Sequence, residues 1–329
     1  MANNSVASTA LVVFTSLNGY DVTAPALAIN SVILVIGILT LVSNAFVLDT
    51  LVRRTSLEAT DLVMCHLAVT DMLTGVLVIH TVAYNLINFQ NVTECLVRLG
   101  AVFTFVGCST WHLALLTLDR FVQIVYPYRY QDVITRKSVS IMSAVIWVCS
   151  VNVGLIPAYG WRDTPGPSEP ACSLLGVLTA GYIQMGLFFT FVPLFVICVL
   201  YMKIFLVARR HSRAIAATDV TGNRNSGSMK FTKTVVLLVG AYIISFSPLA
   251  LITWVYTFGG FHEMSAAAVG DYIVYASVLT FANSLVNPII YAFKLQPVRR
   301  RLLRFLGKGD NSSNSTTNGA VQTIVTHID

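Results

Sequence analysis

Seven long apolar runs are the feature that most constrains how this chain folds. Each has about twenty residues or more, the length that an α-helix needs to cross a hydrocarbon core of about 30 Å. Only 11% of the residues are charged, against roughly 25% in soluble domains. The sequence therefore predicts an all-α membrane protein, a seven-transmembrane helix bundle with spans at residues 26–51, 61–87, 95–125, 139–159, 180–208, 231–258 and 267–293.

The predicted bundle occupies residues 26–293, and three shorter segments flank it. Residues 1–25 lack the basic start and compact apolar stretch of a signal peptide, so we expect an extracellular amino-terminal segment. Residues 294–308 alternate apolar residues with four arginines, typical of an amphipathic helix on the membrane surface with its cations toward anionic headgroups. Residues 309–329 are polar, and we expect a disordered cytoplasmic tail.

Lysine and arginine are distributed unequally between the two predicted sides of the membrane. Of the 21 such residues, only Arg98 and Arg162 fall on one side, and the other 19 fall on the opposite side. The positive-inside rule makes the basic side cytoplasmic, so the amino terminus is expected outside and the carboxy terminus inside. The glycosylation sequons at Asn3 and Asn91 then lie on the extracellular side.

Polar residues at mid-membrane depth are candidates for function, because a charge there is costly. Asp71 lies in the middle of the second span. Other small polar residues occur at comparable depth, namely Asn44, Ser109, Asn283, Ser284 and Asn287. Their carboxylate, hydroxyl and amide oxygens suit a hard monovalent cation. A polar network that only holds helices together is equally compatible with this pattern.

Two further features can be interpreted in more than one way. Asp119 and Arg120 adjoin at the inner end of the third span, where they are either interfacial anchors or part of a switch. Prolines fall one in each of the fourth to seventh spans and can kink helices or act as hinges: Pro157, Pro193, Pro248 and Pro288.

Taken in order, six motifs make residues 33–306 resemble the rhodopsin-like family of G-protein-coupled receptors. The first span contributes an asparagine at 44, and the second reads LAVTDML around Asp71. The third span ends in Asp119-Arg120-Phe121, followed by Pro127 and an Arg-Tyr pair at 129–130. The remaining matches are Trp147 in the fourth span, Pro193 with Tyr201 in the fifth, and NPIIY at 287–291.

The resemblance implies a non-enzymatic plasma-membrane receptor that binds an extracellular small molecule and activates a heterotrimeric G protein. It implies a disulfide between Cys95 and Cys172. It implies an allosteric sodium site, with no other metal or cofactor, at Asp71, Ser109, Asn283, Ser284 and Asn287. The implied switch and G-protein-coupling residues are Asp119, Arg120, Phe121, Pro127, Tyr201, Pro248, Asn287, Pro288 and Tyr291.

The resemblance also places partners around the membrane. Serines and threonines at 312–317 are expected to be phosphorylated by a receptor kinase and so to recruit arrestin. Membrane lipids surround the bundle, and nucleic acid is not an expected partner. A transporter is disfavoured, because the spans contain one deep carboxylate and no internal repeat.

Two positions depart from the family pattern. Phe246 replaces the usual toggle tryptophan of the sixth span, which leaves an uncoupled decoy or scaffold receptor as an alternative function. Ser228 stands where many relatives have an acid that locks the arginine of the third span, so we expect appreciable basal activity.

The expected ligand pocket is mostly apolar. Its candidates, several of which are expected to be core packing only, are Val102, Phe105, Val106, Leu174, Phe246, Ala250, Thr253, Trp254, Val278 and Phe281. Val102 stands where amine receptors have an aspartate, and Phe281 where opsins have a lysine. Such a pocket favours a neutral lipid or other apolar small molecule.

The chain is also similar to the adenosine and lipid-receptor branch of the family, with some likeness to prostanoid receptors. Adenosine receptors have Phe, Asn and His where this chain has Leu174, Thr253 and Phe281. Prostanoid receptors have an arginine at the place of Val278. An adenosine-like or prostanoid-like ligand is therefore an alternative that lacks the matching residues.

Overall fold

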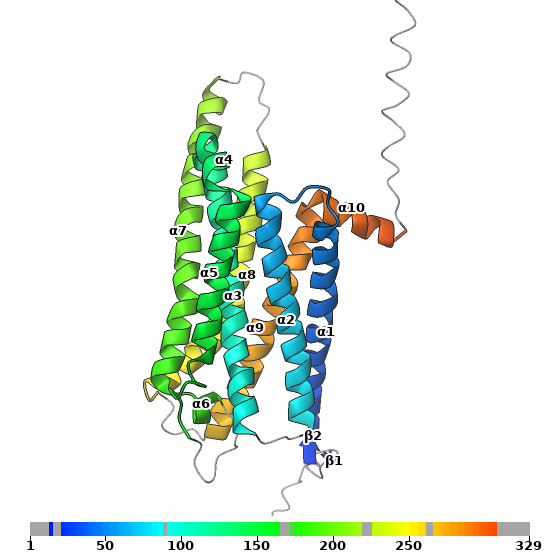
Figure 1. Cartoon of the computed structure of the whole chain (residues 1–329), viewed down its shortest axis with the longest axis vertical. Helices are drawn as coiled ribbons and strands as arrows, with labels where there is room; N and C mark the ends of the chain where they lie inside the picture. Colours follow the sequence, from blue (N-terminus) through cyan, green and yellow to red (C-terminus); the bar gives the residue numbers. More distant parts are fainter. Residues whose placement is uncertain are drawn as a thin grey trace, which may run out of the picture.

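The structure, a computed structural model, describes residues 13–15, 21–87, 91–164, 172, 174–218, 226–260 and 266–307. Seven long helices run side by side as a bundle (Figure 1). They are α1 (Ala24–Val52), α2 (Ala59–Ile87), α3 (Val92–Val125), α5 (Arg136–Leu155), α7 (Ala180–Thr218), α8 (Ser226–Thr257) and α9 (Ala266–Lys294). All seven are long and apolar enough to cross a membrane. The predicted seven-helix bundle is confirmed.

Short elements mark the two ends of the bundle. Strands β1 (Val13–Thr15) and β2 (Asp21–Thr23) pair antiparallel at one end, which also carries α6 (Leu174–Val177) and which we call the α6 end (Figure 1). The opposite end, called the α10 end, carries η1 (Pro127–Arg129), α4 (Tyr130–Val133) and α10 (Gln296–Phe305). The sequence does not predict the two strands, because three residues are too few to show an alternating pattern.

Three helices end or begin several residues away from the predicted span boundaries. Helix α5 ends at Leu155, four residues before the predicted boundary at 159, and Pro157 lies in the turn that follows. Pro157 has no amide hydrogen to donate to the Val153 carbonyl, which instead accepts the Ile156 amide at 3.4 Å, so the regular helix ends before it. The prediction that Pro157 lies within the fourth span is therefore wrong. Helices α7 and α8 extend beyond the predicted 208 and 231, because an apolar run identifies only the part of a helix inside the membrane.

Glycines allow the closest approaches between helices. A Cβ atom placed on Gly154 of α5 would lie 2.4 Å from the Gly100 carbonyl oxygen of α3 and 2.0 Å from the Thr104 hydroxyl. Gly37 and Gly75 make a similar contact between α1 and α2, where a Cβ on Gly75 would lie 2.9 Å from the Gly37 carbonyl oxygen. Small residues at such crossings are what allow membrane helices to pack backbone against backbone.

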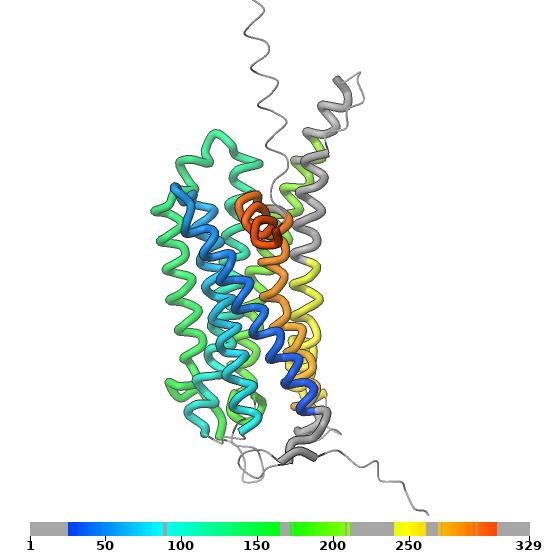
Figure 2. The backbone as a smooth tube through the Cα atoms, turned by 90° about the vertical axis from the view of Figure 1, so that its right-hand side faces the viewer, coloured from blue at the N-terminus to red at the C-terminus, as the bar shows by residue number. Residues whose placement is uncertain are grey.

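Helix α10 lies across the end of the bundle, seen nearly end-on in Figure 2. Val298 on its inner face is buried. The Arg301 guanidinium forms an ion pair with Asp49 of α1, donates to the Thr50 hydroxyl at 3.1 Å, and lies 5.2 Å from the centre of the Phe46 ring. The predicted surface helix is present, but the expectation that all four arginines face headgroups is wrong for Arg301, because Asp49 draws it toward α1.

We predict that Gly154→Ala lowers the free energy of unfolding by about 1–3 kcal/mol, the usual effect of forcing an extra methyl group into a filled space. The control is Gly240→Ala in α8, where an added Cβ has nothing within 4 Å and where alanine favours the helix by up to about 1 kcal/mol. Thermal unfolding of the purified protein in detergent compares the two variants. Equal midpoints would contradict the tight crossing of α3 and α5.

Candidate functional site

The Asp71 carboxylate is the centre of a buried polar cluster between α2, α3 and α9. Its side chain is fully buried. The Asn287 amide donates to Asp71 Oδ2 at 2.8 Å, the Ser109 hydroxyl donates to Oδ1 at 3.5 Å, and the Ser284 hydroxyl also bonds to the carboxylate. Three of the four residues predicted to share a site with Asp71 are thus brought to it.

The fourth predicted sodium residue behaves differently. Asn283 is only half-buried, and in the described part of the chain no hydrogen bond joins it to Asp71. Instead Asn44 of α1 reaches the cluster, because its amide donates to the Ser284 carbonyl at 3.2 Å while its own buried Oδ1 has no partner among the described residues. The cluster offers carboxylate, hydroxyl and amide oxygens, a donor set that fits Na⁺. Sodium binding itself stays a prediction.

Asp119 is held in a fully buried position at the α10 end of α3. It accepts hydrogen bonds from the Thr60 hydroxyl of α2 at 3.1 and 3.0 Å and from the Tyr130 hydroxyl of α4 at 2.8 Å. Burial raises the pKa of the Tyr130 phenol, so it remains a protonated donor. The neighbouring Arg120 Nε lies 3.4 Å from Asp119 Oδ2.

Arg120 is the partly exposed member of this pair. Its guanidinium donates to Gln123 at 2.8 Å, one turn along the same helix. Phe121 packs edge-on against Tyr126 with ring centres 5.8 Å apart, and Pro127 begins η1 directly after it. The predicted residues Asp119, Arg120, Phe121 and Pro127 thus lie where α3 ends and η1 begins.

The two predicted switch tyrosines lie apart from Arg120. The Tyr201 hydroxyl of α7 accepts a hydrogen bond from Thr117 at 3.4 Å. The Tyr291 hydroxyl of α9 is buried and has no hydrogen-bond partner among the described residues. Among the described residues, neither tyrosine is hydrogen-bonded to the arginine.

Phe246 takes part in an aromatic stack at the middle of α8. Its ring lies 4.3 Å from that of Tyr242, nearly parallel, and both pack with Leu113 and Leu194. The Tyr242 and Thr110 hydroxyls are hydrogen-bonded at 2.5 Å, which joins α8 to α3. The sequence did not predict this pair, because a tyrosine and a threonine in apolar spans carry no signal of their own.

Three of the predicted prolines lie inside helices. Pro193, Pro248 and Pro288 lie inside α7, α8 and α9, as predicted.

The ten predicted pocket residues do not form one cluster. Phe246 and Val106 pack in the α3–α7–α8 cluster, whereas Val278 and Phe281 pack against α1 and α2. Leu174 packs in a separate cluster at the α6 end. Val102, Phe105 and Ala250 are half-buried, and Thr253 is buried.

Trp254 lies on the outside of the bundle rather than with Val278 and Phe281. It is 54% exposed and lines a groove of about 790 Å³ between α7 and α8, together with Phe188, Ala250 and Phe258. The orientation of a tryptophan about a helix depends on how that helix is rotated in the bundle, which a single sequence does not specify. The structure therefore separates Trp254 from the other aromatic pocket candidates.

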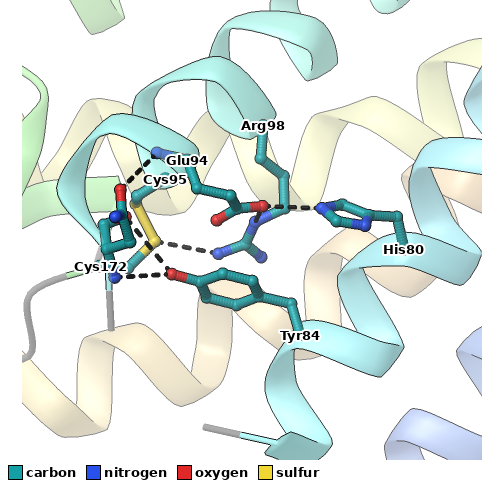
Figure 3. Close-up of a disulfide and its surroundings, with 7 residues drawn as sticks. His80, Tyr84, Glu94, Cys95, Arg98 and Cys172 are labelled. Atoms are coloured by element: carbon teal, nitrogen blue, oxygen red, sulfur yellow. Dashed lines mark hydrogen bonds and ion pairs between the residues drawn. A yellow bond between two sulfur atoms is a disulfide. The ribbon is translucent and has the colours of Figure 1, made fainter. Parts of the chain in front are cut away.

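The predicted Cys95–Cys172 disulfide is confirmed, and an unpredicted polar cluster surrounds it (Figure 3). The Arg98 guanidinium donates to the Cys172 sulfur at 3.0 Å and stacks 4.3 Å from the centre of the Tyr84 ring. Glu94 pairs with Arg98 one turn along α3 at 3.4 Å and with His80 of α2 at 2.8 Å. The i, i+4 spacing of Glu94 and Arg98 could have predicted their ion pair from the sequence.

Several predicted residues lie at the edge of the described structure or outside it. Asn91 caps α3, since its Oδ1 accepts the Glu94 amide at 3.0 Å. Asn3 and the serines and threonines at 312–317 lie outside the described residues, and so does the side chain of Ser228.

A pair of stacked histidines was not predicted from the sequence. His66 and His112 lie between α2 and α3 with ring centres 5.3 Å apart, and Trp147 Nε1 donates to His66 at 3.3 Å.

Comparison with known proteins finds one family and a set of related receptors. The model of the family described as 7 transmembrane receptor (rhodopsin family) matches residues 43–291. Adenosine receptor A3 of Bos taurus is 27% identical over 301 residues, which cover 88% of this chain and 93% of the relative. Adenosine receptor A2b of Gallus gallus is 27% identical over 325 residues, covering 90% and 94%. Adenosine receptor A2a of Homo sapiens is 27% identical over 293 residues, covering 83% and 70%.

We predict that sodium stabilises this protein through Asp71. At a concentration about tenfold above its Kd, one bound ion adds about 1.4 kcal/mol to the free energy of unfolding. Sodium chloride should therefore raise the thermal midpoint above that in choline chloride of equal ionic strength, and Asp71→Asn should abolish the difference. Asp49→Asn, which removes a carboxylate at the end of α1, should leave it intact. A sodium effect that survives Asp71→Asn would contradict the site.

A second prediction concerns the hydrogen bond between Thr110 and Tyr242. Thr110→Val should lower the free energy of unfolding by about 1–3 kcal/mol, because it leaves the buried Tyr242 hydroxyl without its partner. Tyr242→Phe should cost less, about 0.5–1.5 kcal/mol, because the Thr110 hydroxyl still donates to the Val106 carbonyl at 2.7 Å. The double variant should be more stable than Thr110→Val alone, since no tyrosine hydroxyl remains to be left unpaired. Thermal unfolding of the four proteins measures this coupling, with Tyr275→Phe at an exposed position of α9 as control. Strict additivity would mean that the two hydroxyls do not interact.

Proposed function

This chain belongs to the rhodopsin family of seven-transmembrane receptors, and we propose that its extracellular ligand is a neutral, largely apolar small molecule, most simply a lipid. Membership makes it a multi-pass plasma-membrane receptor that has no enzymatic activity and signals through G proteins. The ligand is a separate matter, because receptors of one fold differ in the side chains that line their pockets.

The observation that carries the proposal is the shortage of free polar groups at the predicted pocket positions. Nine of the ten side chains are aliphatic or aromatic. Among these nine, the only polar group is the indole N–H of Trp254, which lies in the outer groove. Thr253 has the remaining hydroxyl, and it donates to the Leu249 carbonyl of its own helix at 2.8 Å. A charged or strongly hydrogen-bonding ligand would lose its hydration there without gaining partners.

Adenosine is the second candidate, favoured by the names of the relatives. A purine nucleoside carries several hydrogen-bond donors and acceptors that must be paired once buried. Leu174 and Phe281 provide none, and the Thr253 hydroxyl, whose hydrogen is donated within its own helix, can only accept. The apolar ligand is therefore preferred over adenosine, and over a carboxylate ligand that would need a cation at Val278.

We place the amino terminus outside the cell and the carboxy terminus inside. The disulfide supports this orientation, because it lies at the α6 end and such bonds persist in oxidising surroundings. Asn91, also at that end, keeps its amide nitrogen available for a glycan while its Oδ1 caps α3. The α10 end then faces the cytoplasm, where Arg120 and its neighbours contact the G protein and where a kinase and arrestin would meet the tail.

The test is G-protein dissociation in living cells with a panel of Gα subtypes. We expect basal or lipid-extract-stimulated dissociation with the wild type, and its loss with Arg120→Ala at equal surface expression. Arg162→Ala, at an exposed arginine of the α6 end, is the matched control and should signal normally. Adenosine should have no effect at concentrations that saturate adenosine receptors. A saturable adenosine response would overturn the ligand proposal and leave the receptor class intact.

A further inference from the structure

A second groove, on the flank of the bundle, has no part in the proposed function. It lies between α3, α5 and α7 and has a volume of about 480 Å³. Its lining is apolar except for the buried indole N–H of Trp111, and includes Trp111 and Leu118 of α3, Val145 and Cys149 of α5, and Phe189 and Leu200 of α7. Val145 is 55% exposed, so the groove opens sideways toward the bilayer. Both α5 and α7 pack on α3, and the groove is the seam left between them.

The groove has a direction along the membrane normal. Helix α3 runs from the α6 end to the α10 end, so Trp111 marks the deeper part of the groove and Leu118 the part nearer the α10 end. Ile141 on α5 and Leu200 on α7 also belong to that nearer part. The groove therefore extends from the middle of the membrane into the half that adjoins the cytoplasm in the orientation proposed above.

Two lysines stand just beyond this end of the groove. Lys137 precedes the lining residue Ile141 by four positions, and Lys203 follows Leu200 by three, so each lies one turn farther along the same helix face. Both ammonium groups are exposed, and neither forms an ion pair within the part of the chain that the structure describes. At this depth each can reach the headgroup layer.

We propose that this groove binds an anionic phospholipid of the cytoplasmic leaflet, with an acyl chain against α3, α5 and α7 and the headgroup between Lys137 and Lys203. An apolar chain fills the seam, and the two cations select a negative headgroup over a zwitterionic one. A sterol would fill the seam but offers no charge to the lysines. The bound lipid would tie α5 to α7, which the groove otherwise separates. The inference uses the proposed orientation but not the identity of the signalling ligand.

The experiment uses the purified full chain in detergent and photoreactive phosphatidylserine with a diazirine in its acyl chain, compared with phosphatidylcholine of the same chains. We expect saturable cross-linking to the groove faces of α5 and α7 that is stronger for phosphatidylserine. The variant Lys137→Gln/Lys203→Gln should weaken phosphatidylserine binding about 25-fold, from about fivefold per cation, and leave phosphatidylcholine unchanged. Arg299→Gln/Arg300→Gln, at exposed cations of α10, is the matched control and should keep the groove cross-links.

A groove-filling variant tests the apolar half of the site. Val145→Trp should abolish groove cross-linking by both lipids, and a thermal midpoint close to that of the wild type confirms that it folds. If it does not fold, the lysine variant decides alone. Equal labelling by the two lipids, labelling that maps elsewhere, or full competition by cholesterol at equal concentration would each overturn the proposal of an anionic phospholipid.

Discussion

Backbone amides and carbonyls find no water in the hydrocarbon core of a bilayer, and this constraint shapes the whole molecule. Helices satisfy these groups internally, so seven apolar runs become seven helices. Many hydroxyl side chains obey the same constraint by bonding to their own helix, as Thr74, Thr81 and Thr253 do with carbonyls four residues earlier. Such groups are satisfied locally and contribute little to the arrangement of the helices.

The few polar contacts that cross between helices therefore carry much of the specificity. Asp71–Asn287 joins α2 to α9, Thr110–Tyr242 joins α3 to α8, and Thr60–Asp119 joins α2 to α3. All six of these groups are buried, so a broken contact leaves a polar group unpaired unless another partner replaces it. Such contacts favour discrete helix arrangements over gradual ones. At the α6 end, a disulfide joins α3 to Cys172 and Arg98 donates to the same sulfur.

Membership of the family and choice of ligand rest on different residues. The resemblance to the family rests on the residues around Asp71, Asp119 and Arg120, all of which lie within the matched range 43–291. The pocket positions depart from those of the adenosine receptors, although these relatives match most of the chain at 27% identity. Phe246 also departs, but its stack on Tyr242 and the bond from Tyr242 to Thr110 keep an aromatic connection between α8 and α3.

The sequence by itself determined the number of spans and singled out Asp71 and the Asp119–Arg120 pair, while the structure decided which neighbours bond to Asp71. Run length and the cost of a buried charge are local properties that need no knowledge of neighbours. Only the tertiary structure decided that Trp254 faces outward, that Arg301 turns to Asp49, and that Tyr242 meets Thr110. These outcomes depend on how each helix is rotated about its axis. Rotation is set by close packing of all seven helices, down to glycine contacts such as Gly100 with Gly154.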